Sequence, residues 1–415
     1  MKNLLIFFGA LVSFSLQAQT YDTNNVVVQT FAGSGFSGYV DGVGQQTMFN
    51  NPNAIVADSH GNLFVWDHAN RRIRRIAPDG TVTTFAGGGN QTTGVGTNVN
   101  LDITNYGVAM TVDRNDTIWL VPFEFAALYK VTSGAVITSS GLPGVTYSYG
   151  ICADSLGNLY ISSSYVHKIF RYTTNGILSV FAGSGNNGYA DGSGIFTAFS
   201  IPKALAIDPA DNIYVWDSGN HLVRRIDQNN NVTTYAGKYG NSSVEPNLDG
   251  VGTNAVLNAI SQMCFDNSGN LLLACGLSIR KISPSTNVVT LAGSFSQSDY
   301  ANGAGNLARF AGSSYGLGVC FSGGMIYVAD SSNQRIRSIT NNPSAEPVQP
   351  ANLQLNTYTG LQITGTVGRT YQVQASPDMT NWTTRATLLL NSSPYLWIDQ
   401  NPVSANKFYR ALLLP

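Results

Sequence analysis

The sequence has 415 residues with a formal net charge of −1, and only 11% of its residues are charged. A typical globular protein has about 25% charged residues, so the polar surface must come mainly from hydroxyl and amide side chains. This charge balance excludes the basic character typical of proteins that bind nucleic acid or anionic membranes.

The N-terminal segment has the pattern of a secretory signal peptide. Lys2 supplies a short positive region, residues 4–16 form an apolar run, and the small residue Ala18 ends the segment. The apolar run is too short for an ordinary membrane span, and no later stretch approaches about 18 apolar residues. We therefore expect residues 1–18 to be a signal peptide and the rest of the chain to have no transmembrane segment. The protein is then expected to be secreted, periplasmic or at the cell surface.

Two motifs recur along the chain. Phe-Ala-Gly or a close variant begins at Phe31, Phe85, Phe181, Tyr235 and Leu291. A turn of the form D-x-x-G-N begins at Asp58, Asp154, Asp208 and Asp266, with looser copies at Asp113 and Ser322. Six copies of the turn indicate six structural units.

Each unit has the pattern of four short strands. In the first unit, the turn lies between apolar runs at 54–57 and 63–66, and its Gly or Asn supplies the positive φ of a hairpin. A third run follows at 71–76, and a fourth at 81–85 leads into the next Phe-Ala-Gly. Six such units predict an all-β, six-bladed β-propeller.

The N-terminal strand is expected to close the ring. The sixth unit ends at Thr340 after its third strand, whereas Val26 to Thr30 form a strand with no unit of its own. Pairing this strand beside residues 335–339 completes the last blade and hides two exposed edges. The predicted propeller therefore spans residues 26–340.

Two units depart from the pattern. Unit three, about residues 141–180, lacks the Phe-Ala-Gly spacer, and unit two has Trp119 to Pro122 in place of W-D-x-x-N. After the propeller, residues 341–350 form a Pro- and Asn-rich linker. Residues 351–415 alternate in hydrophobicity around a central Trp382, which predicts a small β-sandwich.

The repeated segments resemble NHL repeats. The resemblance rests on GNLFVWDHANRRIRRI (61–76), DNIYVWDSGNHLVRRI (211–226) and GMIYVADSSNQRIRSI (324–339). The spacers GYVDGVG and GYADGSG are similar to those of exported bacterial NHL proteins. The C-terminal segment resembles fibronectin-type or immunoglobulin-like modules of such proteins.

Some six-bladed relatives are enzymes, so their metal sites were compared with this sequence. NHL-like amidating lyases hold zinc with histidines at positions that correspond here to Asn53, Tyr149, Lys203 and Ser261. None of these is histidine, and a single aligned His221 does not make a three-ligand site. We interpret the four histidines, His60, His68, His167 and His221, as solvated loop residues. The last three are expected on one face of the propeller, in loops between second and third strands that lie away from the axis.

Calcium sites were considered in the same way. Gluconolactonase-like propellers bind calcium near the axis with Glu, Asn and Asp, but only Glu124, Glu245 and Glu346 occur here, the last in the linker. The D-G-x-G segments, which begin at Asp41, Asp191 and Asp249 with a variant at Asn302, are weak calcium candidates. Each offers one carboxylate, so we favour a structural turn that shapes the rim.

Other recurring side chains are interpreted as structural. The arginines Arg71, Arg72, Arg74, Arg75, Arg224, Arg225, Arg335 and Arg337 recur at one strand around the ring, which predicts pairing with Asp and carbonyl groups between neighbouring blades and no nucleic-acid binding. Trp66, Trp119 and Trp216 are placed at one strand position, where they pack between blades or form a platform for sugars. The cysteines are expected to be buried free thiols, with a Cys264–Cys275 bridge left open.

These features predict a monomeric, exported, non-catalytic scaffold that recognises a protein or polysaccharide through the propeller rim and channel-mouth loops. Asn53, Tyr149, Lys203 and Ser261 are the candidate ligand-binding residues. We expect no cofactor, with calcium as the open possibility. The alternative is a metal-dependent propeller hydrolase or lyase of the lactonase or amidating-lyase type.

Overall fold

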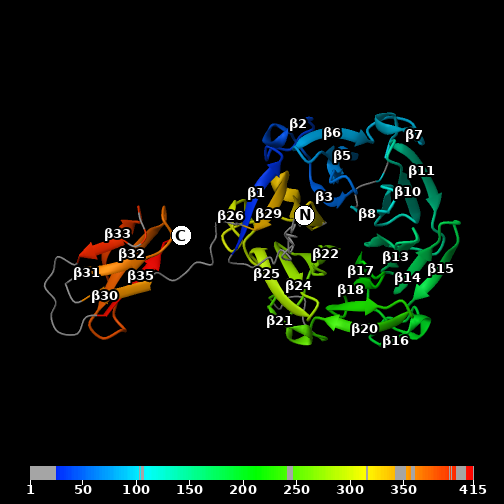
Figure 1. Ribbon diagram of the computed structural model, residues 1–415. Helices are drawn as coiled ribbons and strands as arrows, with labels where there is room; N and C mark the ends of the chain where they lie inside the picture. Colours follow the sequence, from blue (N-terminus) through cyan, green and yellow to red (C-terminus); the bar gives the residue numbers. More distant parts are fainter. Residues whose placement is uncertain are drawn as a thin grey trace, which may run out of the picture. The chain divides into compact units, whose positions relative to one another are not determined.

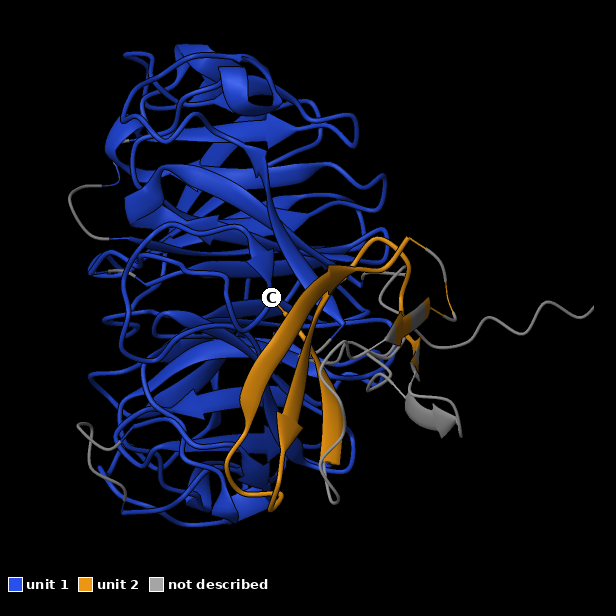
Figure 2. Cartoon of the chain, turned by 90° about the vertical axis from the view of Figure 1, so that its left-hand side faces the viewer, with its two compact units in different colours: residues 1–341 blue, residues 342–415 orange. Residues whose placement is uncertain are grey.

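The structure is a computed structural model. It describes residues 25–101, 103, 107–240, 246–314, 316–341, 352–356, 360–391, 393, 395–398 and 408–414. The chain divides into two compact units, residues 1–341 and 342–415, which are coloured separately in Figure 2. The predicted signal peptide and residues 342–350 of the predicted linker lie outside the described residues.

The first unit is a six-bladed β-propeller built from antiparallel sheets around a central axis (Figure 1). The strands of each blade are given from the axis outward. Blade 1 contains β3 (Pro52–Ala57), β4 (Leu63–Asp67), β5 (Arg72–Ile76) and β6 (Thr81–Ala86). Blade 2 contains β8 (Val108–Val112), β9 (Ile118–Pro122), β10 (Ala127–Val131) and β11 (Val136–Gly141), and blade 3 contains β12 (Ile151–Ala153), β13 (Leu159–Ser163), β14 (Lys168–Tyr172) and β15 (Leu178–Ala182). Blade 4 contains β17 (Pro202–Ile207), β18 (Ile213–Asp217), β19 (Leu222–Ile226) and β20 (Asn231–Ala236). Blade 5 contains β22 (Ile260–Phe265), β23 (Leu271–Cys275), β24 (Ser278–Ile282) and β25 (Asn287–Gly293). Blade 6 contains β27 (Gly318–Ser322), β28 (Met325–Asp330), β29 (Arg335–Asn341) and β1 (Val26–Ala32).

Strand β1 closes the ring as the sequence predicts. It pairs antiparallel with β29, with Val28 opposite Ile339 and Thr30 opposite Arg337. The first and last strands of the propeller therefore share one sheet, and neither leaves an unpaired edge at the junction.

A fifth, two-residue strand covers the outer edge of five blades. The strands are β26 (Gly303–Ala304) on blade 6, β2 (Gly42–Val43), β7 (Gly94–Val95), β16 (Gly192–Ser193) and β21 (Gly250–Val251). They come from the glycine-rich spacers, which the sequence reading treated only as turns. Blade 3 has four strands, which confirms that the short third unit lacks this spacer.

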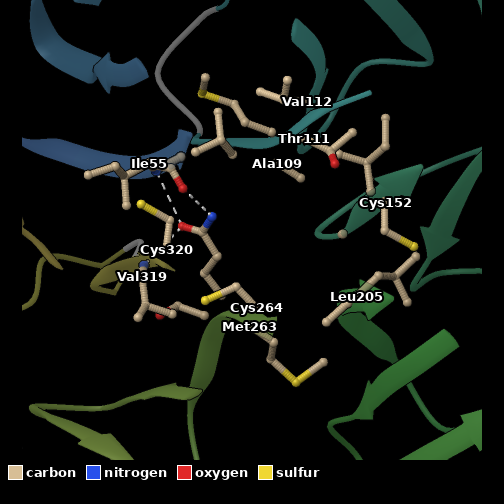
Figure 3. Close-up of a pocket in the computed structure, with 18 of the residues that line it drawn as sticks. Ile55, Ala109, Thr111, Val112, Cys152, Leu205, Met263, Cys264, Val319 and Cys320 are labelled. Atoms are coloured by element: carbon tan, nitrogen blue, oxygen red, sulfur yellow. Dashed lines mark hydrogen bonds between the residues drawn. The ribbon is translucent and has the colours of Figure 1, made fainter. Parts of the chain in front are cut away.

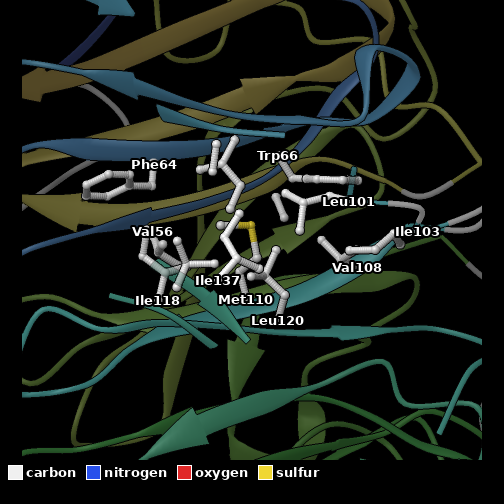
Figure 4. Packing of buried hydrophobic residues seen from close by; sticks show 14 of the residues in the cluster. Val56, Phe64, Trp66, Leu101, Ile103, Val108, Met110, Ile118, Leu120 and Ile137 are labelled. Atoms are coloured by element: carbon white, nitrogen blue, oxygen red, sulfur yellow. The ribbon is translucent and has the colours of Figure 1, made fainter. Parts of the chain in front are cut away.

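The hydrophobic core lies between neighbouring blades. In Figure 4, Phe64 and Trp66 of blade 1 pack with Met110, Ile118 and Leu120 of blade 2. Trp66 and Trp216 are almost completely buried, so their role in packing is confirmed. Burial of each large apolar side chain contributes about 1.5–3 kcal/mol to folding.

Trp119 does not occupy the position of these two tryptophans. It pairs with Lys130 as Phe64 pairs with Arg75, so it lies two residues earlier in its strand than predicted. Its Nε1 donates to Asp113 Oδ2 at 2.8 Å. The position of Trp119 was predicted wrongly because Pro122 stands where the aspartate of the W-D-x-x-N motif lies in other blades. Without this aspartate, the strand of blade 2 cannot be aligned with the others by its motif.

Buried arginines fasten the spacers to four blades. Arg74 is fully buried, and it donates to Asp67 Oδ2 at 2.8 Å, to Asp41 Oδ1 at 2.6 Å and to the carbonyls of Met48 and Val40. The equivalent arginines in blades 4, 5 and 6 are Arg224, Arg280 and Arg337. Their partners lie in the same blade and its spacer, which corrects the prediction of pairing between neighbouring blades.

The three weak calcium candidates take part in this arrangement. Asp41, Asp191 and Asp249 each accept a hydrogen bond from an arginine. Each also accepts from the backbone and hydroxyl groups of a threonine on the outer strand; these are Thr84, Thr234 and Thr290. Their carboxylates therefore hold the spacer against the blade. Among the described residues, no three His, Cys, Asp or Glu side chains are grouped as a metal site.

The four cysteines are free thiols. Cys264 lies opposite Leu272 and Cys275 lies opposite Ile260, so the two are at different ends of the β22–β23 hairpin and form no bridge. Within the part of the chain that the structure describes, no helix has the length and apolarity of a membrane span.

The second unit contains two three-stranded antiparallel sheets. One has the order β30 (Asn352–Asn356), β31 (Gly360–Thr364), β34 (Tyr395–Ile398), and the other β33 (Thr383–Leu389), β32 (Thr370–Ser376), β35 (Phe408–Leu413). Leu361, Ile363, Tyr371, Val373 and Leu390 form their common core. Trp382 is not central as expected: it lies in the β32–β33 turn, where Arg410 stacks on its ring at 4.2 Å. The fibronectin- or immunoglobulin-like type of this unit stays a prediction.

Candidate functional site

The innermost strands surround a channel with a cavity of about 220 Å³ (Figure 3). Its lining consists largely of backbone and of small or apolar side chains, among them Ala109, Leu205 and Val319. The free edges of these strands face the cavity. Polar backbone groups there need partners.

Gln262 supplies several of those partners. It comes from β22 of blade 5, where its Oε1 accepts hydrogen bonds from the backbone N–H groups of Ile55 and Val319, and its Nε2 donates to the Ile55 carbonyl at 2.7 Å. The dashed lines in Figure 3 mark these bonds. One side chain thus connects the inner strands of blades 5, 6 and 1.

Three thiols occupy equivalent positions on the channel strands. Cys152, Cys264 and Cys320 each lie two residues before the turn that ends the inner strand, and all three line the cavity. Burial raises the pKa of each thiol above its ordinary value. Because the thiolate is the reactive form, these groups are poor nucleophiles and poor metal ligands at neutral pH.

Of the four predicted ligand-binding residues, Tyr149, Lys203 and Ser261 line the mouth of the channel, and Asn53 lines the inner cavity that adjoins it. Asn53, Lys203 and Ser261 each lie where the register of an inner strand shifts, as in a β-bulge. Tyr149 precedes the corresponding strand β12. The residue two positions before each of the four has a positive φ; these residues are Asn51, Tyr147, Ile201 and Ala259. The repeated backbone bend turns one side chain per blade toward the opening, a common use of bulges beside binding sites.

A second cavity of about 400 Å³ forms the mouth itself. Phe123, Tyr149, Lys203 and Ser261 line it, and all but Lys203 also line the inner cavity. The rings of Phe123 and Tyr149 lie 4.5 Å apart between centroids, and Lys203 Nζ lies 5.0 Å from the Tyr149 centroid. The mouth thus combines aromatic surface with one cation.

Lys203 is a half-buried amine at the mouth. Burial lowers the pKa of the Lys203 amine because it removes water from the charged form. Among the described residues, no carboxylate forms an ion pair with Lys203. Burial, followed by the charge of Glu124, raises the pKa of the Tyr149 hydroxyl.

The amide of Asn53 is buried. Its exposed fraction is 6%, and neither Nδ2 nor Oδ1 makes a hydrogen bond with the part of the chain that the structure describes. The amide lies beside Gly107: a Cβ built there would be 3.1 Å from Asn53 Nδ2 and 2.9 Å from Phe123 Cε2. An unsatisfied buried polar group costs about 1–3 kcal/mol, so Asn53 is unfavourable for folding unless something else bonds to it.

Ser261 differs from the other three residues. Its hydroxyl donates to the Leu317 carbonyl at 2.6 Å, which ties the inner strand of blade 5 to the start of the inner strand of blade 6; the Ala274 carbonyl of the same blade lies 3.3 Å away. Ser261 therefore shapes the mouth with its donor already engaged.

Phe123 is a mouth residue that the sequence reading missed. It follows β9 in a loop between second and third strands, and such loops were expected to lie away from the axis. In blade 2, Pro122 occupies the position of Asp67, and the chain then brings Phe123 to the mouth, where its N–H donates to the Gly107 carbonyl at 3.1 Å. The proline was the one signal in the sequence that this loop differs.

The histidines do not contribute to the mouth. His68, His167 and His221 lie between the second and third strands of blades 1, 3 and 4, as predicted, and His60 lies in the β3–β4 turn. His167 Nδ1 accepts from the Ile201 backbone, and His60 lies 3.2 Å from Asp116. Glu245 and Glu346 are outside the described residues.

Comparison with known proteins gives partial sequence matches. No family model matches the chain. Teneurin-1 of Gallus gallus is 26% identical over 233 residues, which is 45% of this chain and 8% of that protein. Protein SUPPRESSOR OF QUENCHING 1, chloroplastic, of Arabidopsis thaliana is 36% identical over 81 residues, 19% of this chain and 8% of that protein. The chain spans less than a tenth of the length of these two curated relatives.

Solved structures match much more of the chain. An auxiliary nutrient binding protein from Bacteroides thetaiotaomicron has a TM-score of 0.57 at 19% identity, covering 76% of each chain. Another from Bacteroides ovatus has a TM-score of 0.56 at 18% identity, covering 77% of each chain. A Bacteroides thetaiotaomicron protein of unknown function reaches 0.58 at 19% identity, covering 76% of each chain. These likenesses show a shared propeller fold.

Proposed function

We propose that the protein is an exported, non-catalytic binding protein whose channel mouth holds a polar small molecule or the exposed end of a polysaccharide. The buried amide of Asn53 carries the proposal. It lines the inner cavity together with Phe123 and Tyr149, and this aromatic pair also lines the mouth cavity of about 400 Å³. Small-molecule sites typically combine a few polar groups with aromatic walls in about 300–1,000 Å³.

Two further observations support binding. The mouth is built on bulges of a closed ring, so its side chains are held in place and little ordering entropy opposes association. Solved proteins of the same fold are described as auxiliary nutrient binding proteins, which is consistent with capture of a nutrient by this chain. We infer NHL kinship and export by residues 1–18 from the repeat and leader patterns.

The side chains at the mouth favour binding over catalysis. The candidate residues provide one amide, one phenol, one amine and one engaged hydroxyl. Hydrolase and lyase chemistry generally uses a paired acid and base or a set of metal ligands. The metal-dependent alternative therefore has no specific observation in its favour.

The test uses the full chain. Its binding to a library of monosaccharides, oligosaccharides and other nutrient-sized polar compounds is screened by ligand-observed NMR, and hits are measured by calorimetry. Asn53→Leu keeps the number of side-chain heavy atoms and the branch at Cγ but removes the amide, and it should weaken a hit by about tenfold, the equivalent of one or two lost hydrogen bonds. Asn229→Leu, at an exposed turn position, is the matched control.

Weakening by Asn53→Leu and by Tyr149→Ala, with unchanged binding by the control, supports the channel mouth as the site. Hits that bind equally to all three variants place their site elsewhere and overturn the proposal. N-terminal sequencing of protein recovered outside the producing cytoplasm tests export: a mature chain that still begins at Met1 contradicts it.

A further inference from the structure

We infer that the ligand of the channel mouth is an acidic sugar, and that Lys203 selects its carboxylate. This inference rests on the proposed function and names the class of ligand for the same site.

Lys203 differs from the fully buried arginines of the propeller. Arg74, Arg224 and Arg280 are fully buried, and each forms an ion pair with at least one aspartate. Arg337 pairs with Asp330. Buried charges in proteins are generally paired because desolvation is costly. Lys203 is half-buried, its amine lies over the Tyr149 ring, and among the described residues it forms no ion pair.

A carboxylate of the ligand fits the place of a partner for Lys203. A ligand carboxylate beside Lys203 Nζ would supply the counter-charge that the protein lacks and would offset the desolvation that lowers the lysine pKa. A phosphate carries close to two negative charges and is generally held by several donors, as in arginine forks or backbone nests. A single lysine matches one carboxylate better.

The groups near Lys203 match a hydroxyl-bearing ring in the remainder of the ligand. Gly107 lacks a side chain, and the Phe123 ring and the Asn53 amide both lie against it, so the aromatic pair and the unpaired amide line one continuous opening. An amide can both donate to and accept from hydroxyl groups, and aromatic faces stack on the apolar face of a ring. A carboxylate together with a hydroxyl-bearing ring describes a uronic acid.

The experiment measures calorimetric affinities of the full chain for galacturonate, glucuronate and mannuronate, for their methyl esters, and for the corresponding neutral sugars. At least one uronate should bind about tenfold or more tightly than its ester, the size expected for a charge-assisted hydrogen bond. Lys203→Met retains the aliphatic stem and should abolish this preference. Lys203→Arg should retain most of it, and Lys238→Met, on an exposed loop, should have no effect.

The outcomes separate this inference from the proposed function. If esters and neutral sugars bind as tightly as uronates and Asn53→Leu still weakens them, the binding function stands and the acidic-sugar inference is overturned. If inorganic phosphate displaces the uronate with equal affinity, the site recognises charge alone and the sugar class is wrong. If neither Asn53→Leu nor Lys203→Met alters any binding, both proposals fail. Unchanged melting temperatures of the variants exclude misfolding as the cause.

Discussion

Arg74 Nη2 lies 2.6 Å from Asp41 Oδ1, and this contact fastens the spacer of blade 1 to its outer strands. The blades that have the buried arginine also have an Asp or Asn at the start of the spacer strand. Blade 3 has Phe170 at the arginine position and no spacer strand at all. Blade 2 keeps the spacer strand β7 with Tyr129 at the arginine position, so the arginine fastens the spacer in four blades and is not required for the strand to form.

Arg74→Met should destabilise the propeller strongly. The substitution leaves Asp67 buried without its main counter-charge, and breaking a buried ion pair in this way costs about 3–5 kcal/mol. Urea denaturation of the full chain measures the change. Arg114→Met, at an exposed turn, should stay within about 0.5 kcal/mol of the parent; a loss below about 1 kcal/mol for Arg74→Met would show that the pair contributes little.

Removal of β1 should open the ring. A chain that begins at residue 33 lacks the strand that pairs with β29, and it exposes the edge of β29 and the apolar contacts of Val26 and Val28. We expect a lower melting temperature and rapid proteolysis within blade 6. A chain that begins at residue 25 is the control. Equal protease resistance of both chains would mean that closure by β1 is dispensable.

Asn53→Leu should stabilise the ligand-free protein. The substitution removes a buried amide that has no hydrogen-bond partner and adds apolar contacts, so the free energy of unfolding should rise by about 1–3 kcal/mol. A higher melting temperature combined with weaker ligand binding is typical of a residue retained for function. A clear fall in melting temperature would indicate that the amide has a structural partner in solution.

Lys203 should give the protein a pH dependence at alkaline pH. Its folded-state pKa is lowered from 10.5, so between the two values the unfolded chain binds more protons and the free energy of unfolding rises with pH. Carboxylate binding should fall across the same interval because the amine loses its charge. Calorimetry and denaturation over about pH 7 to 10, with Lys203→Met as the reference, measure both trends; identical profiles for the two proteins would contradict this.

The channel thiols should be unreactive in the native state. Burial raises the pKa values of Cys152, Cys264 and Cys320, so the thiolate fraction at neutral pH is small and reagents have little access. Iodoacetamide labelling followed by mass spectrometry should modify these residues only after denaturation. Rapid labelling of the folded chain at any of the three would show that the channel opens readily.

The features read correctly from the sequence are those that repeat locally. The turn that begins at Asp58 marks a hairpin through short-range hydrogen bonds, and the second strand predicted at 63–66 is observed at Leu63–Asp67. Counting back from the same aspartates led to Asn53 and Lys203, which both lie at a register shift of an inner strand, because the bulge recurs at this position of the repeat. Their role in binding stays a prediction. The spacer strands were missed because two residues show no periodicity.

The parts that were not predictable depend on contacts between blades. Gln262 bonds to Ile55, a residue 207 positions away in the sequence, and no local pattern reports this. The position of Phe123 follows from Pro122, which removed the repeat marker of blade 2 and also misplaced Trp119. That Asn53 lacks a partner is likewise a property of the assembled ring, since an isolated inner strand would leave the amide in water.

The pairing of β1 with β29 also decides how the propeller responds to force. Val26 lies opposite Asn341, so the two ends of the propeller leave from the same end of one sheet. Tension applied between these ends acts first on that terminal pair and then on each following pair in turn, because antiparallel ladder bonds run across the strands. Such loading unzips the strands one pair at a time instead of shearing them together. We therefore expect the propeller to have little mechanical resistance to a force applied between its two ends, although the same pairing of β1 with β29 closes the ring.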